Sequence, residues 1–117
     1  MSFGSWLWQR ITAVLLFFFL GLHLVLEHFS AGSAAPTFAW IVARLQHPVF
    51  LVVDVLFLAV VLFHGLNGLG SVILDLGMPP RYGRSLSAGL WLLGAASFVL
   101  GLDIILPLAG YPAWFYW

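Results

Sequence analysis

The chain of 117 residues contains no cysteine and no lysine, and its ionised side chains are limited to four arginines and four acids. Without cysteine it forms no disulfide, offers no thiolate nucleophile and ligates no iron–sulfur cluster through sulfur. The formal net charge is zero, so no basic surface points to nucleic acid. A redox cofactor held by this chain must therefore bind through histidine or without a protein ligand.

Apolar side chains are what the sequence has in excess. Hydrophobic residues make up 63% of the chain and charged residues only 7%, which is far outside the range of soluble domains. A water-soluble domain of this size could not bury so much apolar surface. The composition predicts an all-α integral membrane protein with a single domain, residues 1–117. The first apolar run outlasts the apolar region of a signal peptide, so we expect this helix to be retained.

Three apolar runs predict transmembrane helices, because each is long enough to cross a hydrocarbon core of about 30 Å. Pro48 suits the first turn of the second helix, and Gly77-Met78-Pro79-Pro80 ends it. A short segment from Phe38 to Leu45 precedes it, which we expect at the membrane interface. The predicted spans are about residues 8–29, 48–76 and 86–108.

The arginines indicate an orientation. Arg10, Arg81 and Arg84 lie on one side of the predicted membrane, and Arg44 lies alone on the other. The positive-inside rule therefore predicts a cytoplasmic N-terminus and an external C-terminus. Polar groups inside only three helices normally face a cofactor or another subunit, so we expect the helices to pack with a partner.

His64 lies near the middle of the second span, where an imidazole is costly without a partner. It could be the axial ligand of a b-type haem, with the second axial ligand supplied from elsewhere. Gly68, one turn on, would then leave room for the porphyrin. Alternatively, His64 bonds a neighbouring helix and the glycines serve helix packing.

Asp75 lies 11 residues after His64. At about 100° per residue the two side chains point the same way, ~16 Å apart along the axis. Asp75 could carry protons near a quinone or bond a haem propionate. It could equally be a helix-end carboxylate that pairs with Arg81 or Arg84.

Arg10 and His23 are further candidates in the first span. Arg10 could donate to a quinone carbonyl or a haem propionate, although a snorkelling anchor explains its position as well. His23 lies ~20 Å further along the helix. It could ligate a second haem, contact a propionate or pack structurally, and Glu27 on the same face could bond it.

Two segments resemble a known family. Gln9-Arg10-Ile11-Thr12-Ala13 and His64-Gly65-Leu66-Asn67-Gly68, followed by Asp75-Leu76-Gly77, are similar to the membrane-anchor subunits of succinate dehydrogenase (respiratory complex II, succinate:quinone oxidoreductase). The length and the three-helix layout fit this family as well. Of the two anchors in such a complex, the chain resembles most the smaller, cytochrome b-type one.

The resemblance implies roles for single residues. His64 corresponds to the axial ligand of haem b, and the partner anchor supplies the other histidine. Asp75 corresponds to the acid beside the quinone (ubiquinone or menaquinone), and Arg10 lies near that quinone and the haem propionates. His23 corresponds to the outer haem ligand in relatives with two haems, although single-haem relatives can keep a histidine there.

One position departs from the family pattern. Some relatives have a tyrosine directly after the aspartate, which bonds the quinone, and this chain has Leu76. The resemblance therefore leaves that hydrogen-bond donor to the partner anchor or to Tyr82, Trp6 or Trp8.

The resemblance also implies partners and a location. A flavoprotein subunit oxidises succinate, an iron–sulfur subunit passes the electrons on, and two anchors hold the quinone in the plasma membrane of a prokaryote. The complex could form a higher oligomer. The alternatives are an anchor of quinol:fumarate reductase, a haem-free membrane scaffold, and a small transporter with Asp54, His64, Asp75 and Asp103 as a proton path.

Overall fold

The computed structural model describes residues 3–29 and 37–112, and this part of the chain contains helices and no strand. Three segments are long and apolar enough to cross a membrane, with lengths of 25, 28 and 29 residues. This confirms the prediction of an all-α membrane protein. The elements are α1 (Phe3–Phe29), α2 (Phe38–Leu45), α3 (Pro48–Asp75), a 3-10 turn η1 (Pro80–Tyr82) and α4 (Gly83–Leu108).

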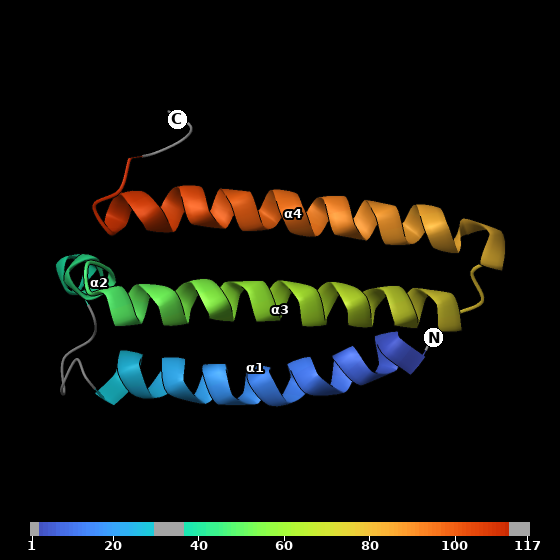
Figure 1. Ribbon diagram of the computed structural model, residues 1–117, viewed down its shortest axis with the longest axis horizontal. Coiled ribbons are helices and arrows are strands. Elements are labelled where there is room, and N and C mark those ends of the chain that lie inside the picture. The colour runs from blue at the N-terminus through green and yellow to red at the C-terminus, as the bar shows by residue number, and fades with distance from the viewer. Residues whose placement is uncertain (1–2, 30–36, 113–117) are drawn as a thin grey trace.

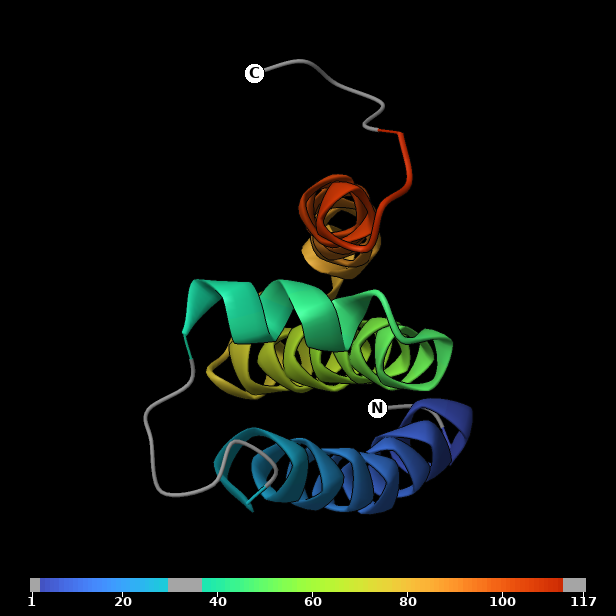
Figure 2. The same ribbon diagram turned by 90° about the vertical axis from the view of Figure 1, so that its left-hand side faces the viewer.

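The three long helices lie side by side with α3 in the middle, and α3 runs opposite to both α1 and α4 (Figure 1). Both outer helices pack on α3. The short helix α2 lies across the end of the bundle where α1 finishes and α3 starts, as the end view shows (Figure 2). The opposite end therefore gathers the start of α1, the end of α3 and the turn η1.

The helix ends follow local backbone chemistry. The predicted segment Phe38–Leu45 is helical, and the Thr37 side chain caps it by accepting from the Trp40 backbone N–H at 3.2 Å. Pro48 occupies the first turn of α3. Gly77 follows that helix with φ +96°, a left-handed conformation that suits glycine and ends helices.

Two helices begin earlier than the hydropathy predicted. α1 starts at Phe3 rather than near residue 8, and α4 starts at Gly83 rather than near residue 86. In α1 the added turn brings Ser5 against Asn67 of α3, where the Ser5 hydroxyl donates at 3.1 Å. The polar start of the helix is thus held by a contact with another helix, which a hydropathy profile does not detect.

Two glycines let α4 approach α3 closely. A Cβ at Gly94 would lie 2.8 Å from Leu66 Cδ1, and one at Gly101 would lie 2.5 Å from Leu58 Cδ2. These glycines are seven residues apart on α4, so they share one face of that helix. Close contact through small residues is how helices associate where lipid removes the hydrophobic driving force.

The described part of the chain buries polar groups more than large apolar ones. Its buried residues are Thr12, Arg44, Leu45 and Asp103, whereas bulky side chains such as Phe17 (83% exposed) point outward. This is the reverse of a soluble domain, and it suits a bundle whose outer faces meet lipid or other subunits. The groups that hold the helices together are therefore also the candidates for function.

Candidate functional site

His64 lies in the interface between α3 and α1, half-buried, with both ring nitrogens close to α1. Its Nδ1 lies 3.2 Å from Thr12 Oγ1, and its Nε2 lies 3.4 Å from Gln9 Nε2. Gln9 and Thr12 are three residues apart and therefore share a face of α1. The histidine that the sequence singled out is thus held by two side chains of the first helix.

The directions of these hydrogen bonds follow from the atoms involved. The Gln9 amide nitrogen also lies 3.3 Å from the His64 carbonyl oxygen, which can only accept. That end of the Gln9 amide must therefore be the NH2 group, and His64 Nε2 accepts from it. On the other side, the Thr12 hydroxyl donates to the Trp8 carbonyl at 2.8 Å, so its oxygen accepts from His64 Nδ1–H. The imidazole consequently carries its proton on Nδ1 and a lone pair on Nε2.

The same chain of bonds continues toward the start of α1. Gln9 Oε1 accepts from the Asn67 amide at 2.6 Å, and Asn67 Oδ1 accepts from the Ser5 hydroxyl at 3.1 Å. We call these side chains the polar ladder: Ser5, Gln9, Thr12, His64 and Asn67. Every member is formally neutral, and each named bond has a donor facing an acceptor.

The ladder fits the ligand role expected for His64. An imidazole that binds iron needs a lone pair on one nitrogen and usually donates its other N–H to an acceptor, and His64 meets both requirements. Among the described residues no three histidines or acids cluster around a metal position, so this site offers one imidazole. A Cβ at Gly68 would lie 2.9 Å from Gln9 Nε2. The space beside Gly68 thus holds the Gln9 amide, which would have to move for a porphyrin to reach Nε2.

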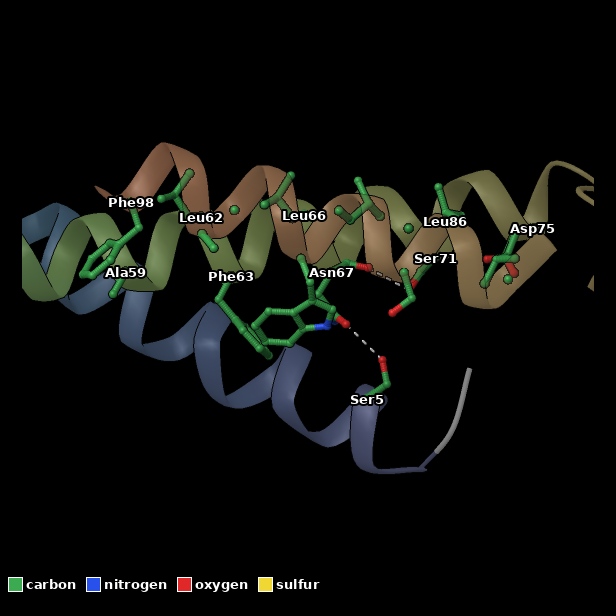
Figure 3. Close-up of a pocket in the computed structure, with 18 residues that line it drawn as sticks. Ser5, Ala59, Leu62, Phe63, Leu66, Asn67, Ser71, Asp75, Leu86 and Phe98 are labelled. Atoms are coloured by element: carbon green, nitrogen blue, oxygen red, sulfur yellow. Dashed lines mark hydrogen bonds between the residues drawn. The ribbon is translucent and has the colours of Figure 1, made fainter. Parts of the chain in front are cut away.

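A largely apolar groove of about 480 Å³ runs between α3 and α4. Figure 3 shows Ala59 and Phe98 toward one end and Asp75 toward the other. Hydroxyl groups of Ser71 and Ser87 also line it, and Asp75 itself is exposed. The groove therefore offers an apolar channel with a solvent-accessible carboxylate at one end.

The structure places the other predicted quinone residues outside the lining of this groove. The Arg10 guanidinium lies 5.3 Å from the centroid of the Trp6 ring. The Trp8 ring meets Phe63 edge-on at 6.4 Å, and Tyr82 lies beneath the Arg81 guanidinium at 4.8 Å. All three predicted residues lie at the end of the bundle that carries Asp75 (Figure 1), but in this chain they do not meet around one cavity.

A second polar group joins three helices at the opposite end of the bundle. Arg44 Nη2 of α2 lies 2.7 Å from Glu27 Oε1 of α1 and 2.6 Å from Asp54 Oδ2 of α3. The Arg44 side chain is only 7% exposed, and its guanidinium faces the rings of Trp40 and Phe50. His23 Nδ1 lies 3.4 Å from Asp54 Oδ1. We call His23, Glu27, Arg44 and Asp54 the charged cluster.

The charged cluster differs from what the sequence predicted. Glu27 pairs with Arg44 rather than with His23, whose ring instead faces Asp54 and Phe57 at a centroid distance of 5.2 Å. Arg44, which looked isolated in the sequence, is the centre of the cluster. Its pairing with Asp54 depends on the turn between α2 and α3, and the only sequence signal was a buried acid ten residues from an arginine.

These features define a class of protein: a multi-pass membrane protein whose polar groups lie between its helices rather than on a soluble face. The match to known families is more specific. Residues 2–102 match the model of the Succinate dehydrogenase/Fumarate reductase transmembrane subunit, and the chain belongs to this family.

Several curated proteins are similar to this chain. The succinate dehydrogenase hydrophobic membrane anchor subunit of Thermoplasma acidophilum is 27% identical over 101 residues, which cover 86% of this chain and 82% of the relative. The corresponding anchor subunit of Archaeoglobus fulgidus is 31% identical, with 86% of each chain covered. The succinate dehydrogenase 2 membrane subunit SdhC of Mycobacterium tuberculosis is 32% identical, covering 82% of this chain and 68% of that one. No solved structure gives a significant match.

The family match confirms the resemblance found in the sequence. The relatives are named as membrane subunits of an enzyme complex, succinate dehydrogenase, which implies partner subunits. The names of these relatives do not distinguish the smaller anchor from the larger one, so the likeness of this chain to the smaller anchor stays a prediction.

Proposed function

We propose that this chain is a membrane-anchor subunit of a succinate:quinone oxidoreductase in the plasma membrane of a prokaryote, with its N-terminus in the cytoplasm. In this role His64 ligates haem b, and the end of the α3–α4 groove at Asp75 helps to form the quinone-reduction site. The observation that carries the proposal is the polar ladder, because it presents a lone pair on His64 Nε2 in the middle of a membrane-length helix.

Haem b, when bound, supplies a one-electron redox centre within the membrane. This chain contributes one axial ligand through His64 Nε2, and the second anchor contributes the other. Thr12 holds the opposite ring nitrogen. Arg10 lies exposed two residues before Thr12 on α1 and provides a cation for a propionate or for the quinone.

His23 is the candidate for a second haem site or a propionate contact. Its Nδ1 faces Asp54, which is the kind of carboxylate partner that orients a ligating histidine through its other nitrogen. The side chain is 31% exposed. We therefore treat one haem at His64 as the proposal and a second at His23 as a separate outcome of the same experiment.

Quinone reduction requires two electrons and two protons for each quinol formed. The electrons come from an iron–sulfur subunit, which receives them from a flavoprotein that oxidises succinate to fumarate. Asp75 is exposed at the groove's end, so it can give a proton to a quinone oxygen and regain one from water. The apolar part of the groove suits a hydrocarbon tail of ubiquinone or menaquinone, and Arg10, Trp8 and Tyr82 provide N–H and O–H donors at the same end.

The experiment is a reduced-minus-oxidised visible spectrum with a haem-to-flavin ratio, measured on the purified complex. Wild type is compared with His64→Ala, His23→Ala and the exposed control His47→Ala. We expect His64→Ala to lose a b-type haem band while His47→Ala keeps it. A full haem content in His64→Ala would contradict the proposal. Loss of a separate haem in His23→Ala would add the second site.

One observation favours a second candidate, a haem-free membrane scaffold. Both ring nitrogens of His64 already have partners within the chain, so the histidine is satisfied as a packing residue. That function predicts a complex that assembles and reduces quinone with no b-type absorption in wild type. The same spectrum therefore separates the two candidates.

A further inference from the structure

We propose that Thr12 and Gln9 are positioning residues that fix the proton of His64 on Nδ1, so that Nε2 is the only ring atom able to bind iron. This inference rests on the proposed haem function for its purpose, but the proton position can be measured without haem. It assigns roles to two residues of α1 that neither touch the quinone groove nor carry charge.

Thr12 sets one side of the ring. It is buried, with 6% of its surface exposed, and its hydroxyl hydrogen is directed to the Trp8 carbonyl one turn earlier in α1. The hydroxyl has only one hydrogen, so the oxygen presents a lone pair to His64 Nδ1. A proton on Nδ1 makes a hydrogen bond there, whereas a lone pair on Nδ1 would face another lone pair.

Gln9 sets the other side. Its amide oxygen is taken by Asn67 at 2.6 Å, and its NH2 group faces both the His64 carbonyl oxygen and Nε2. A proton on Nε2 would oppose this NH2 group. The two sides therefore select the same tautomer, and moving the proton to Nε2 would replace two attractive contacts by two repulsive ones.

Gly68 makes the position of Gln9 possible. A Cβ at residue 68 would come within 2.9 Å of the Gln9 amide nitrogen, whereas a Cβ at Gly65 would meet nothing within 4 Å. In this chain the amide covers Nε2 and accompanies its lone pair. Iron and the amide cannot occupy the same side of Nε2, so ligation requires the Gln9 side chain to rotate away while Thr12 keeps its bond.

The bond to Thr12 also tunes the redox centre in the ligated state. An imidazole whose second N–H is held by an acceptor is a stronger electron donor to its metal, which favours the ferric form. Loss of that acceptor should shift the equilibrium toward ferrous iron about tenfold, which for a one-electron couple corresponds to about 59 mV.

The first test measures the haem midpoint potential and the electron paramagnetic resonance spectrum of the purified complex. Thr12→Val removes the hydroxyl with little change of shape, and Thr12→Ser keeps it. We expect Thr12→Val to raise the potential by about 59 mV, the tenfold shift, and to alter the spectrum, while Thr12→Ser stays like wild type. Equal potentials and spectra in all three proteins would overturn the proposal.

The second test needs no haem and covers the case in which a Thr12 variant fails to assemble. The full chain, labelled with ¹⁵N-histidine, is placed in lipid bilayers without haem, and His64→Ala identifies the His64 signals by their disappearance. We expect a protonated Nδ1 and an unprotonated Nε2 in wild type, and a mixture of tautomers in Thr12→Val. A protonated Nε2 in wild type would overturn the proposal.

The two tests also separate this inference from the proposed function. If the His64→Ala complex keeps its full haem content, the haem function fails, and the tautomer found in the haem-free chain still decides whether Thr12 and Gln9 position the proton. If His64→Ala loses the haem but Thr12→Val changes neither potential nor tautomer, the haem function stands and this inference fails.

Discussion

The polar ladder and the charged cluster hold α1 against α3 at two different places, and they do so with different chemistry. The ladder uses neutral side chains in bonds whose directions are all determined. The charged cluster places one arginine between two carboxylates and a histidine. Ion pairs tolerate changes of angle, whereas a hydrogen bond to an imidazole selects one tautomer. The comparison indicates that the cluster fixes the helices in place and the ladder prepares a ligand atom.

The energies of the two regions should differ in the same sense. Removal of one partner from a buried ion pair costs about 3–5 kcal/mol, because the remaining charge is left without compensation. A single neutral hydrogen bond contributes about 0.5–1.5 kcal/mol net. Substitutions at the two ends therefore give a graded series that can confirm or contradict this division.

The largest effect is expected for Arg44→Met. It removes the cation between Glu27 and Asp54, whose side chains are 17% and 11% exposed, and should lower the free energy of unfolding by about 3–5 kcal/mol. Equilibrium unfolding of the chain in detergent or lipid measures this change. Arg84→Met, which alters an exposed arginine at the other end, is the matched control. Equal effects of the two variants would show that the cluster is not what fixes the helices.

The next effect is expected for Gly68→Ala. The added Cβ would displace the Gln9 amide and weaken two of the ladder's bonds, at a cost of about 1–3 kcal/mol. It should also leave both His64 tautomers populated in the labelled, haem-free chain. Gly65→Ala is the control, since its Cβ meets nothing within 4 Å, and replacing a mid-helix glycine should stabilise by about 0.5–1 kcal/mol. A large loss of assembly in Gly65→Ala alone would instead locate a partner helix on that face.

A third pair of substitutions compares function at the two ends. Asp75→Asn should lower the rate of succinate-dependent quinone reduction about tenfold, or about 1.4 kcal/mol, because the groove loses its proton donor. Electron transfer from succinate to a soluble dye should be unchanged. Asp54→Asn should have the opposite profile, with weaker assembly and a normal rate for each assembled complex. A tenfold loss of quinone reduction in Asp54→Asn would place the quinone at the opposite end of the bundle from Asp75.

The smallest effect is expected for Ser5→Ala. It removes only the terminal bond of the ladder, from the Ser5 hydroxyl to Asn67, and should cost about 0.5–1 kcal/mol. The tautomer of His64 should not change, because Gln9 and Thr12 keep their partners. Nuclear magnetic resonance of the labelled chain and equilibrium unfolding measure the two expectations together. A changed tautomer in Ser5→Ala would mean that the ladder acts as one unit rather than through its two contacts with the ring.

Much of the fold was predictable because membrane-length apolar runs leave the backbone few alternatives to helix. The interfacial helix Phe38–Leu45 and the end of α3 at Gly77 were predicted from composition and turn residues, and the structure confirms that Phe38–Leu45 is helical and that α3 ends at this point. The early start of α1 was missed, since its cause is the contact between Ser5 and Asn67. Likewise, Gln9 and Thr12 appeared in the sequence only as parts of a family-like segment, with no indication that they meet His64.

The sequence by itself determined the class of this protein: a cysteine-free, weakly charged chain whose three apolar runs must lie in a membrane, with one histidine at mid-depth. Family membership followed from the same residues. Only the tertiary structure decided which atoms of that histidine are free to bind, and that Arg44 joins three helices. The physical reason is that hydropathy acts along a single helix, whereas hydrogen-bond direction and charge pairing depend on side chains 10 to 62 residues apart being brought within 3.4 Å.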